Sequence, residues 1–122
     1  MKVAEYHRQG LHHRVESPPP DYTPLGQEVR ESGHRVAFFA RVENEHLADV
    51  VYTSSKRCRK LMALADVAAE RLKGQPASGY HLDPDALVDF FREERDRAKM
   101  HARVQLIMNA LGLSKPLTGR VD

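Results

Sequence analysis

Cys58 is the only cysteine of this chain, and it stands among positively charged residues where the sequence predicts the start of a helix. Arg57, Arg59 and Lys60 are its close neighbours. A helix amino terminus and adjacent cations both stabilise a thiolate, which is the nucleophilic form of cysteine. These residues therefore predict an accessible and unusually reactive thiol. The alternative is a small buried side chain, because a lone cysteine beside leucines and outside any CxxC pair usually packs as a hydrophobe.

The helix that would present Cys58 is expected to end at Gly74. Ser54 or Ser55 is predicted to cap its amino terminus, which places Cys58 in the first turn. The apolar residues of this segment recur at helical spacing, so one face should be buried. They are Leu61, Leu64, Ala65, Ala68 and Leu72.

A β-hairpin is expected just before this helix. Residues 33–42 alternate between apolar and polar positions, which predicts a strand with one face toward the core. The core positions are Val36, Phe38, Ala40 and Val42. Residues 43–46 are polar enough to turn the chain, and residues 47–53 supply a second β-branched and aromatic run. Residues 25–31 would add an edge strand, although they include Gly26, a residue that is unfavourable within strands.

Helical patterns dominate the rest of the chain. Asp83 followed by Pro84 predicts a helix amino terminus, and Leu87, Phe90 and Phe91 give that helix an apolar stripe. A last helix is expected from about Arg97 to Gly112. Strands first and helices after predict an α+β fold, in which helices pack on one face of a three-stranded antiparallel sheet.

A chain of 122 residues is expected to form a single domain over residues 1–122. The triple proline at residues 18–20 forbids continuous helix or central strand, so residues 1–23 are predicted to be an irregular segment with at most a short helix before the prolines. Residues 113–122 are expected to be a flexible tail.

Composition excludes several functional classes. A single cysteine cannot form an internal disulfide, which favours the reducing cytoplasm. A formal net charge of +2 is too small to indicate nucleic-acid binding. The longest apolar run is too short to span a bilayer, and residues 1–10 have no signal-peptide core, so no membrane association is expected.

Side chains elsewhere give little sign of catalysis. No glycine-rich phosphate loop, Ser-His-Asp order or carboxylate pair stands out, which favours a scaffold or carrier over a catalyst and leaves enzymatic activity open. His12 and His13 suit an exposed segment. Asp66 is expected to point outward or to pair with an arginine or lysine one turn away.

Several segments together resemble the amino-terminal iron–sulfur scaffold proteins of the IscU/SufU/NifU family. Residues 13–18 are similar to the family's early His-Tyr-x-Asn-Pro segment, and residues 32–34 (Ser-Gly-His) lie where the family has Cys-Gly-Asp before a strand. Residues 48–52 resemble its next strand. Cys58 precedes a small-residue helix that ends in Lys-Gly, as the family's second ligand cysteine does. Residues 99–101 (Lys-Met-His) fall where a third cysteine opens the last helix.

The resemblance implies a ligand set around Cys58. Family members that build clusters present three cysteines and an aspartate, whereas this chain offers Ser32, His34 and His101 near the other positions. A thiolate with two imidazoles suits a zinc or iron ion, with Ser32 or water in a fourth position. A stable [2Fe–2S] cluster is disfavoured, because such clusters usually need four protein ligands dominated by thiolates.

Two functions follow from the resemblance. The first is a scaffold-like or accessory role in iron–sulfur cluster assembly, in which the protein binds a metal ion or accepts sulfur at Cys58 and docks to a cysteine desulfurase or another assembly protein. The second is a protein-interaction module on the same fold with a non-functional metal site. If the metal site is preserved, Cys58, His34 and His101 should converge.

Overall fold

Three antiparallel strands form one sheet in the order β1-β2-β3. They are β1 (Thr23–Glu31), β2 (His34–Glu43) and β3 (His46–Ser54). The computed structural model of the chain describes residues 1–113. Both strand connections are two-residue turns with positive φ, at Ser32 (53°) and Gly33 (83°) and at Asn44 (51°) and Glu45 (65°). Such turns match the twist of paired strands, and the second one confirms the hairpin predicted at residues 43–46.

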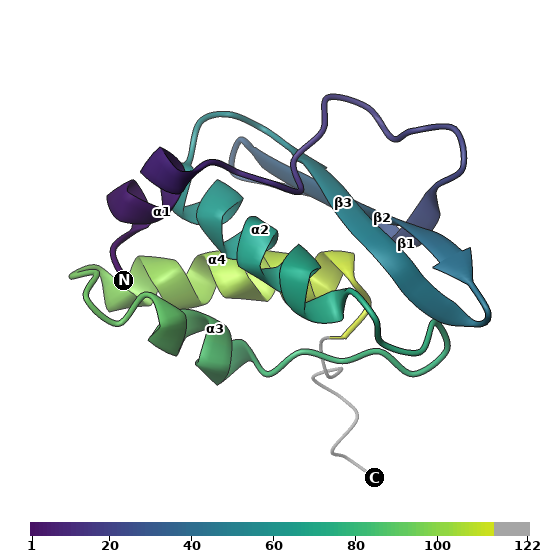
Figure 1. Cartoon of the computed structure of the whole chain (residues 1–122). Coiled ribbons are helices and arrows are strands. Elements are labelled where there is room, and N and C mark those ends of the chain that lie inside the picture. Colours follow the sequence, from purple (N-terminus) through teal and green to yellow (C-terminus); the bar gives the residue numbers. More distant parts are fainter. Residues whose placement is uncertain (114–122) are drawn as a thin grey trace, which may run out of the picture.

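Four helices complete the α+β fold that the sequence predicts. They are α1 (Val3–Gln9), α2 (Arg59–Leu72), α3 (Pro84–Phe90) and α4 (Arg97–Ala110). In Figure 1 the helices lie together on one side of the sheet, with α2 against β3 and α4 against β1 and β2. Asp83 caps α3 as predicted, because its Oδ1 accepts hydrogen bonds from the backbone N–H of Asp85 and of Ala86. None of the helices within residues 1–113 is long and apolar enough to cross a membrane.

The buried face of β2 follows the predicted alternation except at its end. Val36, Phe38 and Ala40 are at most 1% exposed and pack in the core. Val42 was expected beside them and is instead 46% exposed. The prediction is wrong there because Val42 lies at the exposed end of β2, where the register with β3 shifts between Arg41 and Val42.

The segment before β1 ties the two edges of the sheet together. After α1, Arg14 pairs in parallel with Tyr52 of β3 at one edge, and Thr23 begins β1 at the other (Figure 1). Residues 15–22 therefore cross the sheet without regular structure. Helix α1 is the short helix allowed for in the irregular segment 1–23. The predicted tail, residues 113–122, lies outside the described residues from position 114 onward.

Candidate functional site

Cys58 is the N-cap residue of α2, one position before the first turn in which it was expected. Its backbone is extended, with φ −127°, and its Sγ accepts a hydrogen bond from the backbone N–H of Leu61 at 3.4 Å. The predicted serine caps are therefore wrong. Ser54 ends β3 and accepts hydrogen bonds from Arg14, and the Ser55 hydroxyl accepts one from the backbone N–H of Arg35. Both serine hydroxyls therefore accept hydrogen bonds from neighbouring segments, and the Cys58 thiol caps the helix instead.

The thiol is buried rather than accessible. Cys58 is 9% exposed and belongs to the hydrophobic core, so the predicted accessible side chain is wrong and the alternative of a small buried residue describes its packing. Cys58 nevertheless lines the floor of a surface pocket between the starts of α1, α2 and α4. The other residues around this pocket are Val3, Ala4, Arg57, Arg59, Lys60, Glu94 and Lys99.

Arg103 of α4 is the residue at this site that the sequence prediction missed. Its Nε donates a hydrogen bond to the Cys58 Sγ at 3.3 Å, across 45 residues of sequence. A hydrogen bond from a charged donor becomes stronger as its acceptor becomes negative. The available signal was helical spacing: Lys99 and Arg103 are four residues apart and share one face of α4.

His34 begins β2 beside the same cations. Burial lowers its pKa, and the positive charges of Arg103, Arg57 and Lys99 lower it further. Its Nδ1 is buried and has no hydrogen-bond partner among the described residues. The imidazole therefore lies next to a group of positive charges that disfavour its protonated form.

The predicted ligand set does not assemble into a metal site. Within residues 1–113, no group of three or more His, Cys, Asp or Glu side chains is placed to hold a metal ion. Ser32 is exposed in the β1–β2 turn, and His101 is exposed on α4. His101 lies two residues from both Lys99 and Arg103, and a two-residue step rotates a side chain about 200° around a helix, so it faces away from the side that carries these cations.

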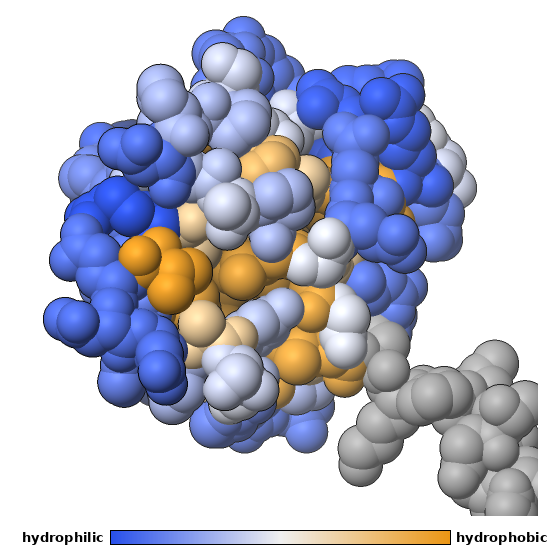
Figure 2. Space-filling model, turned by 90° about the vertical axis from the view of Figure 1, so that its right-hand side faces the viewer, coloured by the Kyte–Doolittle hydropathy of each residue, from blue (hydrophilic) through white to orange (hydrophobic). Residues whose placement is uncertain are grey.

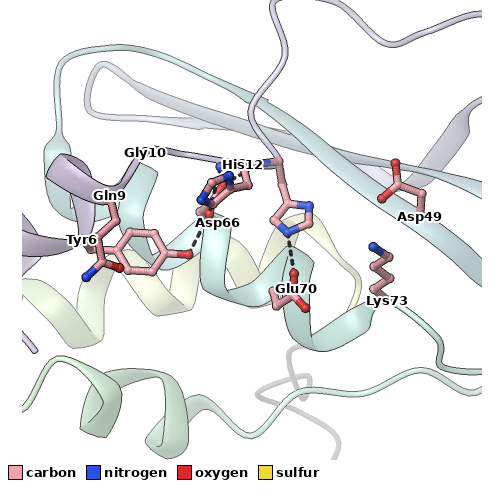
Figure 3. Close-up of a pocket in the computed structure, with 9 residues that line it drawn as sticks. Tyr6, Gln9, Gly10, His12, Asp49, Asp66, Glu70 and Lys73 are labelled. Atoms are coloured by element: carbon pink, nitrogen blue, oxygen red, sulfur yellow. Dashed lines mark hydrogen bonds and ion pairs between the residues drawn. The ribbon is translucent and has the colours of Figure 1, made fainter.

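A second polar cluster surrounds Asp66 of α2, which is 0% exposed. Its carboxylate accepts hydrogen bonds from the Tyr6 hydroxyl at 2.7 Å and from the backbone N–H of His13 at 2.9 Å and of His12 at 3.4 Å (Figure 3). The expectation that Asp66 points outward or pairs with a cation is wrong. It points inward because its carboxylate accepts hydrogen bonds from Tyr6 of α1 and from the backbone that follows α1.

His13 is likewise buried, at 8% exposed, and not solvent-exposed as expected. Its Nδ1 lies 3.1 Å from the carbonyl oxygen of Val50, and its Nε2 lies 2.7 Å from the Glu70 carboxylate. Both ring nitrogens are thus engaged by β3 and α2. The cluster around Asp66 and His13 fastens the N-terminal segment to the helix that carries Cys58, which gives these residues a structural role.

This cluster predicts a loss of stability in alkali. Burial, and then the hydrogen bond and charge of Asp66, raise the pKa of Tyr6 above the ordinary value of 10.0. The folded state then holds the phenol proton where the unfolded chain releases it, so stability is intact below pH 10 and falls as the pH rises further. Tyr6→Phe should flatten the slope of unfolding free energy against pH above 10, measured by urea titration. An unchanged slope would contradict this coupling.

Comparison with known proteins gives little guidance. No family model matches the sequence, and no curated protein matches it. Among solved structures, one described as "Crystal structure of a hypothetical protein at 2.3 A resolution" is similar to 90% of this chain and 79% of its own length, with 14% sequence identity and a TM-score of 0.47.

Proposed function

We propose that this protein is an accessory protein of iron–sulfur cluster assembly that accepts sulfur at Cys58. The observation that carries the proposal is the pair of donors on Sγ, the backbone N–H of Leu61 and the Nε of Arg103. Both stabilise a thiolate at a position that lines a surface pocket. The three-stranded antiparallel sheet with α2 following Cys58 also agrees with the fold that the family resemblance implies.

The chemistry needs only a thiolate and a persulfide donor. The Cys58 thiolate attacks the terminal sulfur of a persulfide on a cysteine desulfurase and forms a new S–S bond. The S–S bond of the donor breaks, and its electron pair leaves with the donor thiolate. Arg103 is placed to balance the negative charge on Cys58 before the transfer and on its persulfide afterward.

A resident zinc or iron ion does not fit the residues present. Within residues 1–113, Cys58 does not belong to any group of three or more Cys, His, Asp or Glu side chains that could hold a metal ion. Arg103 contacts the sulfur directly, and Arg57, Lys60 and Lys99 stand around the same pocket. Positive charges at these positions oppose the approach of a metal cation. No step of the proposed function therefore uses a metal.

Sulfur transfer is the direct test. The protein is mixed with a persulfide-loaded cysteine desulfurase, and intact mass is followed with time. We expect the wild-type chain to gain one sulfur atom and Cys58→Ser to gain none. Arg103→Leu should slow the transfer about tenfold, because a charge-assisted hydrogen bond to the thiolate is lost.

Two controls make this result interpretable. Cys58→Ser should keep its unfolding free energy within about 1 kcal/mol of the wild type, because serine is a better N-cap than cysteine. Arg97→Leu removes an exposed arginine from the same helix and should transfer sulfur at the wild-type rate. Equal mass gain in Cys58→Ser, or no gain in the wild type, would contradict the proposal.

A protein-interaction module is the second candidate. Figure 2 shows apolar residues gathered at the centre of one face of the molecule and surrounded by hydrophilic ones. Val42, at 46% exposed, is the large hydrophobic residue most open to solvent among those described. Desulfurase binding that is equally tight in Cys58→Ser, without any sulfur transfer by the wild type, would favour this function over sulfur acceptance.

A further inference from the structure

Positive charges from two helices converge on Cys58. Arg57 precedes α2 and Lys60 lies in its first turn, whereas Lys99 and Arg103 belong to α4. Arg57, Lys60 and Lys99 line the pocket that includes Cys58, and the Arg103 Nε is 3.3 Å from its sulfur. The amino terminus of α2, a 14-residue helix, adds its own positive end.

Carboxylates neutralise only part of this charge. Glu94 lies in the pocket, but its carboxylate forms an ion pair with Lys60, at 3.7 Å, and accepts a hydrogen bond from the backbone N–H of Val3, at 2.8 Å. Lys99 is 4.0 Å from Asp96 at the rim, where both side chains are about half exposed. Within residues 1–113, neither Arg57 nor Arg103 has a carboxylate at ion-pair distance. Among the described residues, Arg57 thus lacks a counter-ion, whereas Arg103 donates to the Cys58 sulfur.

His34 lies near the same cations, although it lines a different pocket, together with Ser32 and Arg35. Its buried Nδ1 is the side-chain nitrogen or oxygen that has no partner within the described part of the chain. Burial and the charges of Arg103, Arg57 and Lys99 lower the pKa of His34, and the carboxylate of Glu31 opposes them in part, so the imidazole lies near these three cations. An anion near them would supply the negative charge that this group of residues lacks.

We propose that the pocket beside Cys58 binds a small tetrahedral dianion, and that the sulfur donor it fits is thiosulfate. The second part rests on the proposed function, since it names the class of donor for the same thiol. Guanidinium groups recognise oxyanions through paired N–H donors, and a dianion matches the positive charges of Arg57 and Lys99, which line the pocket.

The transfer from thiosulfate is balanced without any added reductant. The Cys58 thiolate attacks the outer sulfur of thiosulfate, and a new S–S bond forms at Sγ. The S–S bond of thiosulfate breaks, and its electron pair leaves with sulfite, a dianion. Cys58 becomes a persulfide anion, so the total charge is the same before and after. Arg57 and Lys99 are placed to stabilise the departing sulfite.

Sulfate, which cannot donate sulfur, tests the binding site alone. Its affinity is measured by isothermal titration calorimetry with potassium chloride holding the ionic strength constant. Arg57→Gln/Lys99→Gln should weaken sulfate binding about tenfold or more. Arg8→Gln/Arg92→Gln removes the same charge at two exposed positions outside the pocket and should bind as the wild type does. Equal weakening in the two double variants would overturn the site.

Thiosulfate tests the donor. We expect wild-type Cys58 to gain one sulfur atom with equimolar release of sulfite, and Cys58→Ser to show neither. Sulfate binding without this transfer would overturn thiosulfate as the donor. If a persulfide-loaded desulfurase still modifies Cys58 in that case, the inference fails while the proposed function stands. If neither donor modifies Cys58, the proposed function fails as well.

Discussion

Gly26→Ala should destabilise the protein by about 4 kcal/mol, because an added methyl group would collide with the end of α4. Gly26 has φ +72°, and a Cβ at this position would lie 2.0 Å from the carbonyl oxygen of Ala110. The obstacle is backbone, which cannot rotate away as a side chain can. Either β1 or α4, the helix that carries Arg103, must move. Urea unfolding of the purified variant measures the loss.

Gly112→Ala is the matched control for this substitution. Gly112 has nearly the same φ, +74°, but a Cβ there would meet no atom of residues 1–113 within 4 Å. The strain of placing alanine in the left-handed region should cost about 1 kcal/mol at either position. The difference between the two variants therefore measures the collision alone. Equal losses would show that α4 yields easily and would contradict the close approach.

The surroundings of Gly26 show which features a local sequence pattern does not predict. Residues 25–31 were predicted to form an edge strand in spite of Gly26, and β1 does form there, from Thr23 to Glu31. The register between β1 and β2 shifts between Leu25 and Val29, where Gly26 lies, so the residue marks an irregularity and a close contact. Period-2 alternation predicted the hairpin because that signal is local. The contact with α4 depends on a partner far along the chain.

One part of the candidate site was likewise predictable from local sequence, and another part was not. The position of Cys58 at a helix start was predictable from the strand before it and the apolar spacing after it. Its burial and its contact with Arg103 were not, because they depend on how α4 packs beside α2. The family resemblance placed the start of the last helix near this thiol, but the residue facing the thiol is Arg103 and not His101. The site is therefore characterised by the positive charges around Cys58 and not by a set of metal ligands.

Asp66 had a signal in the sequence that was overlooked. It interrupts an otherwise apolar stretch of α2 in which every position from Leu61 to Ala69 is buried. A carboxylate inside such a stretch must have hydrogen-bond donors, because an unpaired buried charge is costly. The donors are the Tyr6 hydroxyl and the backbone of His12 and His13, which the sequence alone could not place.

Asp66→Ala should therefore lower the free energy of unfolding by about 3 kcal/mol, because it leaves several donors without an acceptor. Asp66→Asn keeps the size and one acceptor oxygen but turns an amide N–H₂ toward a donor, so an intermediate loss is expected. Asp89→Ala removes an exposed carboxylate that pairs with Arg97 at 3.4 Å, and it should change stability by no more than about 0.5 kcal/mol. Urea unfolding at pH 7 compares the three variants.

Asp66→Ala also tests whether the burial of the Cys58 thiol and the stabilisation of its thiolate have separate causes. Asp66 holds the N-terminal segment onto α2, and Val3 of α1 lines the pocket beside Cys58. Loss of Asp66 should loosen this segment and make the buried thiol react faster with a neutral reagent such as iodoacetamide. Arg103→Leu should have the opposite effect, because the thiolate loses its charged donor. If both variants altered labelling in the same direction, the burial of Cys58 and the stabilisation of its thiolate could not be independent properties of the fold.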